Sequence, residues 1–224
     1  MSDPISLAIV LALLALVPLT AVMTTSFLKI AIVLSLVRNA LGVQQVPPNM
    51  ALYGLALVLS AYVMAPVIHE VNTAMRDPLA SRATHEPSEE AQHKQLIGIL
   101  QALEAGVVPM QDFMLRNSKP EQRDFFMRTA QRLWGTDRAE GLKENNLFVL
   151  VPAFLVSELT AAFQLGFLLY LPFIVIDLIV SNILLAMGMM MVSPVTISMP
   201  LKLFLFVMVD GWTRLIQGLV LSYR

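Results

Sequence analysis

The stretch GMMMVSP, residues 188–194, lies inside a run without charged residues from Leu178 to Leu201. Glycine permits backbone angles that other residues avoid, and proline lacks the backbone donor of a helix interior, so Gly188 and Pro194 predict a helix break. Three consecutive methionines cannot all face one side of a helix. Two interpretations are open: an apolar kink in a membrane helix, or a loop whose adaptable Met side chains close around a variable partner.

The composition is that of a membrane protein. Of the 224 residues, 57% are hydrophobic and 14% charged, whereas soluble domains are roughly 45–50% apolar and about 25% charged. The mean hydropathy is +0.70. A net charge of −1 argues against a large nucleic-acid-binding surface, so no nucleic acid is expected as a partner.

The sequence contains no recognisable catalytic or metal-binding pattern. It has no Cys, and its three histidines, His69, His85 and His93, lack the spacing of a zinc site. Nucleotide-binding and hydrolase motifs do not occur. We therefore expect no catalytic residues, no metal, no cofactor and no enzymatic activity.

The charged residues divide the chain into three parts. Of the 31 charged residues, 22 lie between Glu70 and Glu144. This predicts an N-terminal apolar helical hairpin over 1–69, a polar helical region over 70–146 and a C-terminal apolar helical hairpin with the methionine loop over 147–224.

In the N-terminal part, residues 5–28 and 50–68 are two runs free of charge. The first is long enough as a helix to cross a hydrocarbon core of about 30 Å, and Pro66 is expected to break the second run near its end. Without a basic segment before it, the first run is interpreted as retained rather than cleaved. Lys29 and Arg38 favour a cytoplasmic location for their side and place the polar region across the membrane.

The polar region predicts short amphipathic helices. One is expected to end at Gly106, and another to begin at Ser118 and end at Gly135. The basic residues of the second helix alternate with Glu121 and Asp124, which favours a solvated helix face over a binding patch.

Two acids, Glu158 and Asp177, interrupt the C-terminal apolar part, where Pro172 is expected to separate them. A carboxylate at membrane depth costs on the order of 3 kcal/mol, so such groups need partners. Before Arg214, the only cations close to the apolar runs are Lys29, Arg38 and Lys202. We expect at least one of them to lie within hydrogen-bonding reach of an acid and to support assembly.

Several long motifs resemble the SctR/FliP family of type III secretion export-apparatus proteins. They are FLKI at 27–30, RNALG at 38–42, QQVPPN at 44–49, PAF at 152–154, SEL at 157–159, GFLLYLPF at 166–173, IDL at 176–178, the methionine stretch 188–194 and Leu205–Trp212. They cover nearly the whole chain in order. Flagellar members typically carry an extra cleaved N-terminal signal, and its absence here resembles the virulence injectisome branch, named SctR, YscR, HrcR or PscR.

The resemblance implies an all-α protein with the hydropathy of a four-span membrane protein. It further implies helical hairpins that assemble with SctS and SctT into a conical helical complex containing a homopentamer of this chain. The complex would sit at the bacterial inner membrane, protrude towards the periplasm and work with SctV. Apolar runs would then be covered largely by protein, with lipid as the remaining neighbour, and Met189, Met190 and Met191 would line the channel as a gasket.

The function that the resemblance implies is a pore-forming subunit of a protein export gate, through which unfolded polypeptides pass. Two alternatives remain from the residues themselves. One is a self-contained proton or ion transporter that uses Glu158 and Asp177. The other is an assembly scaffold without a channel.

Overall fold

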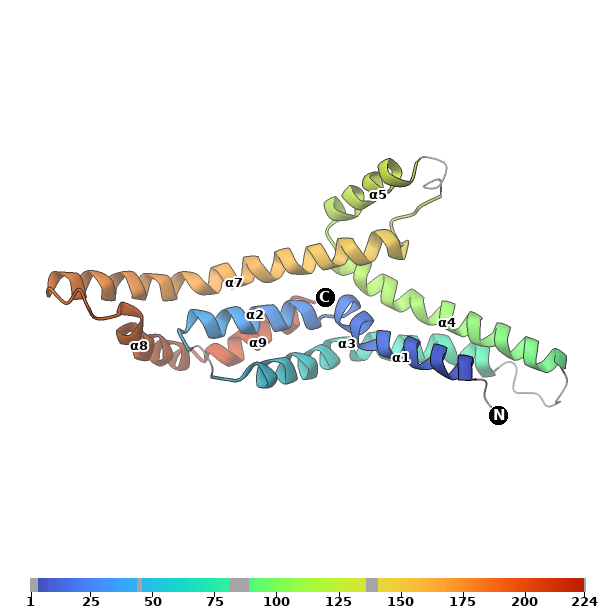
Figure 1. Cartoon of the computed structure of the whole chain (residues 1–224), viewed down its shortest axis with the longest axis horizontal. Helices are drawn as coiled ribbons and strands as arrows, with labels where there is room; N and C mark the ends of the chain where they lie inside the picture. Colours follow the sequence, from blue (N-terminus) through green and yellow to red (C-terminus); the bar gives the residue numbers. More distant parts are fainter. Residues whose placement is uncertain (1–3, 44–45, 81–88, 136–140, 224) are drawn as a thin grey trace. The chain divides into compact units, whose positions relative to one another are not determined.

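The computed structural model describes residues 4–43, 46–80, 89–135 and 141–223, and every regular element in these ranges is an α-helix (Figure 1). The helices are α1 (Pro4–Thr24), α2 (Phe27–Ala40), α3 (Asn49–Ala80), α4 (Glu89–Asn117), α5 (Pro120–Trp134), α7 (Leu147–Ala186), α8 (Pro194–Met208) and α9 (Gly211–Leu221). The prediction of an all-α fold is confirmed.

Three predicted helix breaks are wrong. α3 continues through Pro66, α7 continues through Pro172, and α4 continues through Gly106. A proline removes one backbone hydrogen bond, and a long helix keeps the bonds on either side of it. Glycine permits a turn without requiring one, and Gly106 lies where α4 approaches the Met75 side chain, 3.0 Å from a built Cβ.

One helix break was missed. The charge-free run 5–28 is divided between α1 and α2 at residues 25–26. The hydroxyl groups of Thr24 and Thr25 donate to the carbonyl oxygens of Thr20 and Ala21, at 2.8 and 2.6 Å. Such bonds from a side chain to the preceding turn compete with the helical ladder and bend helices.

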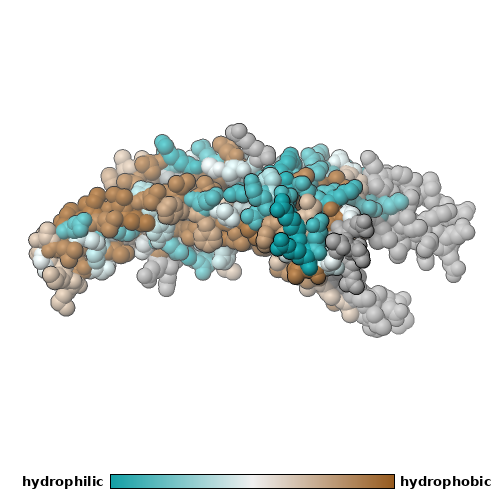
Figure 2. Space-filling model, turned by 90° about the horizontal axis from the view of Figure 1, so that it is seen from above, coloured by the Kyte–Doolittle hydropathy of each residue, from teal (hydrophilic) through white to brown (hydrophobic). Residues whose placement is uncertain are grey.

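Two helices are long and apolar enough to cross a membrane among the described residues, within Asn49–Arg76 and Leu147–Ala186. Two bent pairs pass the same test, one of them α8 with α9 at an angle of 62°, so the chain has up to four candidate spans. Figure 2 shows hydrophobic residues covering the end formed by α7 and α8. These features agree with the expected all-α membrane protein.

The chain forms two compact units, each built from two separate stretches of sequence. Unit 1 comprises Met1–Thr25 and Ala61–Ser157, and unit 2 comprises Ser26–Ser60 and Glu158–Arg224. The three-part division at residues 69 and 146 describes the charge pattern and stays a prediction.

In unit 1, the corner between α4 and α5 is fixed against the start of α7. The rings of Phe113 and Phe154 lie 5.9 Å apart between centroids. The backbone N–H of Lys119, which precedes α5, donates to Ser157 Oγ at 2.9 Å. Side chains of α7 therefore satisfy a donor at the N-terminus of α5, where helices leave backbone donors unpaired.

In unit 2, α2 occupies the centre of the core. Its buried residues are Lys29, Ile30, Ala31, Val33, Leu34, Val37 and Ala40. They pack in one cluster with residues of α3, α7, α8 and α9, including Leu52, Phe173, Phe206 and Leu219. Gly166 of α7 lets the two helices approach closely, because a Cβ built there would lie 2.3 Å from Leu36 Cδ1.

Candidate functional site

The methionine stretch is a tight turn between α7 and α8, and its first half is a Schellman motif. The N–H of Gly188 donates to the carbonyl of Leu185 at 3.0 Å, and the N–H of Met189 donates to that of Leu184 at 2.9 Å. Gly188 has a φ of +74°, the left-handed conformation that this motif requires after a helix. Gly188 therefore ends α7 by a defined hydrogen-bond pattern, as its place in the sequence predicted.

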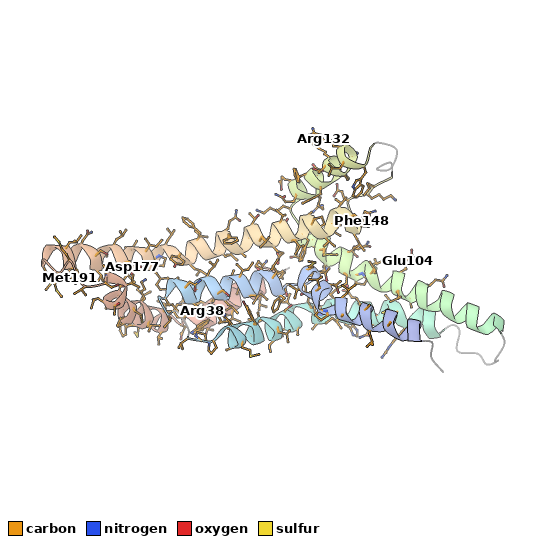
Figure 3. The ribbon with its side chains drawn as sticks, in the orientation of Figure 1. Arg38, Glu104, Arg132, Phe148, Asp177 and Met191 are labelled. Atoms are coloured by element: carbon orange, nitrogen blue, oxygen red, sulfur yellow. The ribbon has the colours of Figure 1, made fainter. Side chains whose placement is uncertain are left out.

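The three methionines differ in exposure because of this geometry. In the chain by itself, the exposed fractions are 40% for Met189, 81% for Met190 and 101% for Met191. Met189 stands at the position of a Schellman motif that usually contacts the preceding turn, here the buried Leu184. The turn therefore presents Met190 and Met191 to whatever lies beyond it, and Figure 3 shows Met191 at the α7–α8 end.

The second half of the turn leads into α8 at Pro194, in the first helical position that proline favours. Asp177 of α7 holds α8 in place through two contacts. Its Oδ2 lies 2.6 Å from Lys202 Nζ, and its Oδ1 accepts a hydrogen bond from the Ser198 hydroxyl. Lys202 Nζ also donates to the carbonyl of Ala40, the last residue of α2, at 3.3 Å.

A second buried cluster lies in the same unit. Lys29 Nζ of α2 lies 3.1 Å from Glu158 Oε1 of α7, and both side chains are almost inaccessible to water. The Tyr223 hydroxyl donates to Glu158 Oε2, and its ring centroid lies 3.6 Å from Lys29 Nζ. A cation over an aromatic face is attracted by the ring quadrupole, so Tyr223 stabilises both charges.

Of the three cations, Arg38 is the one that has no ion pair with an acid among the described residues. Its Nη1 donates to the carbonyl of Pro47 at 3.3 Å and to Asn49 Oδ1. Its Nε has no hydrogen-bond partner within the described part of the chain. Arg38 therefore braces the turn between α2 and α3.

The structure thus brings the sequence-predicted residues together in two groups, Lys29 with Glu158 and Lys202 with Asp177. Sequence reasoning missed Tyr223 and Ser198. Ser198 and Lys202 are spaced i,i+4 in an apolar stretch, which places both on one helix face and was a usable signal. Tyr223 gave no such signal. No group of three or more acidic or histidine side chains is placed to hold a metal ion among the described residues.

A protein-family model matches most of the chain. The model of the FliP family matches residues 10–219. The chain belongs to the FliP family. The match contains both ion pairs and the methionine turn, so these features lie in the part of the chain that the family shares.

Relatives of this FliP-family chain are named as translocation, secretion or virulence proteins. It is 53% identical to the Yop proteins translocation protein R of Yersinia pestis, over 99% of this chain and 97% of the relative. It is 44% identical to the harpin secretion protein HrcR of Erwinia amylovora, over 99% and 97% of the two chains. It is 45% identical to the virulence protein YscR of Salmonella typhimurium, again over 99% and 97%.

Proposed function

We propose that this chain is a pore-forming core subunit of a type III secretion export gate, which passes unfolded polypeptides across the bacterial inner membrane. Five copies assemble with SctS and SctT, and the complex protrudes towards the periplasm and works with SctV. The chain itself performs no catalysis, so the driving force comes from other components.

The methionine turn is the observation that carries this proposal. Met190 and Met191 project from a turn whose ends are fixed by the Schellman motif and by the Asp177 contacts. Rigid ends with soft, polarisable tips suit a ring that closes on itself and yields to chains of varied sequence. Gly188 and Pro194 set the turn, and Met189, Met190 and Met191 form the gasket.

The apolar surface of unit 2 supports an assembled state. Only 17% of an apolar 18-residue stretch of α7 is buried within the chain. The exposed residues of α7 include Phe163, Phe167 and Leu178. A surface this apolar needs a cover of protein or lipid. We expect neighbouring subunits to cover most of it and lipid to cover the rest.

The test truncates the three methionines and keeps Gly188 and Pro194, which set the turn. In the triple variant Met189→Ala, Met190→Ala and Met191→Ala, we expect the complex to assemble and to conduct small ions across a bilayer. Truncation removes several heavy atoms per subunit from the opening, and the side chains are exposed in the single chain, so folding loses little. The measurement is the conductance of the purified complex in a planar bilayer, variant against parent.

Met208→Ala is the matched control, because Met208 is 67% exposed in the same unit but lies outside the turn. This control should stay as tight as the parent. A triple variant that assembles and is equally tight contradicts the gasket. Loss of the complex itself would assign the methionines to packing, since truncation of a core Met typically costs about 2–5 kcal/mol.

The transporter alternative has no support in the relatives, which are named as translocation and secretion proteins. Both acids that a transporter would use are engaged, Glu158 with Lys29 and Asp177 with Lys202. Their positions suit structural ties between helices.

A further inference from the structure

One face of α5, in unit 1, has features that the export-gate proposal does not use. Six residues line a surface hollow of about 440 Å³, and we call them the α5 face: Glu121, Asp124, Phe125, Arg128, Thr129 and Arg132. At 100° per residue they form a single stripe along the helix. Figure 3 labels Arg132 on this helix.

Among the described residues, the one ring contact of the α5 face is between Phe125 and Phe126 of the same helix, 5.1 Å apart between centroids. Phe125 is 57% exposed at its middle, and no ion pair involves any of its four charged side chains in those residues. Arg123, on the opposite side of α5, does have partners within the chain. It binds Glu144 Oε2 at 3.1 Å and the Ser118 carbonyl at 2.6 Å.

The order of residues along the face is symmetric about the point midway between positions 126 and 127. The acids Glu121 and Asp124 occupy the N-terminal half, and the bases Arg128 and Arg132 occupy the C-terminal half. An antiparallel copy of the same helix therefore matches it. Glu121 then opposes Arg132 of the partner subunit, and Phe125 opposes Arg128 of the partner subunit, an ion pair and a cation–π contact that each occur twice.

We propose that the α5 face binds the α5 face of a second copy of this chain, with the two helices antiparallel. A parallel pair is disfavoured because it opposes acid to acid and base to base, and like-charge contacts are costly. A strongly acidic or basic partner is disfavoured too, since the two acids and two bases of the face balance. An exposed aromatic ring between them supplies the apolar centre typical of interfaces.

This contact is separate from the ring contact that the export gate requires. A two-fold contact joins copies in pairs, whereas neighbours in a five-membered ring meet through two different surfaces. The α5 pair therefore forms between free copies of the chain. It does not depend on the proposed function and can be tested in membranes that contain the full chain alone.

The first test is disulfide crosslinking on the cysteine-free background. Two differently tagged full-length chains are produced together, one with Glu121→Cys and the other with Arg132→Cys. Both positions lie near the centre line of the face, so they oppose each other in the antiparallel pair and oxidation should join the two tags. Two chains that both carry Glu121→Cys should crosslink poorly, because their cysteines are offset by about 16 Å along the axis. The reverse order of yields would overturn the antiparallel arrangement.

The second test is charge reversal, read as the yield of a crosslink between Phe125→Cys in one tagged chain and Arg128→Cys in the other, positions that also oppose each other in the antiparallel pair. Glu121→Arg and Arg132→Glu should each lower the yield by about tenfold or more, since each creates two like-charge contacts. The chain that carries both substitutions should regain the yield, because the pairs are restored in reversed order. Glu104→Arg, at an exposed site of α4 in the same unit, is the matched control and should change nothing.

The double variant separates a lost contact from a lost fold, because it contains both single changes. A double variant as weak as the singles overturns the proposal. Single reversals that leave the yield unchanged also overturn it, as does a crosslink from position 132 that joins a different protein.

Discussion

The two lysine–carboxylate pairs of unit 2 use the same residue types in different surroundings. In the Lys29–Glu158 pair the side chains are 5% and 2% exposed, whereas in the Lys202–Asp177 pair Asp177 keeps 30% of its surface exposed. Both pairs tie α7 to another helix. Water can help to solvate only the second pair, so the loss of one partner should have unequal consequences.

The two ion pairs also differ in the groups that surround them. Glu158 and Lys29 share Tyr223, which closes their surroundings with a hydroxyl and a ring. Asp177 and Lys202 are completed by the Ser198 hydroxyl and the carbonyl of Ala40 at the end of α2. The first pair belongs to the core of the unit, and the second fixes the helix that follows the methionine turn.

The largest effect is expected from Glu158→Gln. This change leaves the Lys29 ammonium buried without a counter-charge, and breaking a buried pair in this way typically costs about 3–5 kcal/mol. We expect impaired assembly, measured as the amount of complex recovered in mild detergent and the temperature at which it dissociates.

The matched control removes both charges. In Lys29→Met with Glu158→Met, no ion remains to be solvated, and the Tyr223 hydroxyl can still donate to the Ser26 carbonyl, 3.2 Å away. This double variant should assemble better than Glu158→Gln. Normal assembly of Glu158→Gln with a selective loss of proton-coupled export would instead favour the transporter interpretation.

An intermediate effect is expected from Tyr223→Phe. The ring over Lys29 stays, and one hydrogen bond to the Glu158 carboxylate is lost, which costs about 1.5–3 kcal/mol for a charged acceptor. The dissociation temperature of the complex should fall less than in Glu158→Gln. The dissociation temperature should be lower still in Tyr223→Leu, because the cation–π contact is lost as well. Equal dissociation temperatures for Tyr223→Phe and Tyr223→Leu would show that the ring contributes nothing.

The sequence predicts the turn at the candidate site well because the signals there are local. Gly188 and Pro194 each constrain their own backbone, so the end of α7 and the start of α8 follow from residue type. Proline does not end a helix elsewhere in the described part of the chain: at Pro66 and Pro172 the missing hydrogen bond is one among many in helices of 32 and 40 residues. A proline inside an otherwise regular helix therefore does not by itself end it.

The ion pairs show the opposite limit. The sequence predicts that Glu158 and Asp177 need cations, since each is a carboxylate inside a long apolar run, where an unpaired charge is costly. It does not predict which cation, because Lys29 and Glu158 are 129 positions apart and meet only when α2 packs on α7. Tyr223 was missed for the same reason, since its contacts depend on tertiary packing.

The smallest loss of stability is expected from Asp177→Asn, at about 1–2 kcal/mol. The amide oxygen can still accept from Ser198 or Lys202, the Ala40 carbonyl still faces Lys202, and water reaches the site. The complex should therefore assemble nearly as well as the parent. Its gate should be affected more, because Asp177 joins α7 to α8 beside the methionine turn, and a looser α8 lets the turn move.

We therefore expect Asp177→Asn to raise ion conductance in a planar bilayer more than it lowers the dissociation temperature. Asp210→Asn is the control, because Asp210 is exposed in the same unit and has a φ of +52°, which Asn tolerates. It should change neither quantity. If Asp177→Asn destabilises the complex as much as Glu158→Gln while the gate stays tight, the contrast between the two pairs is wrong, and Asp177 serves the core rather than the turn.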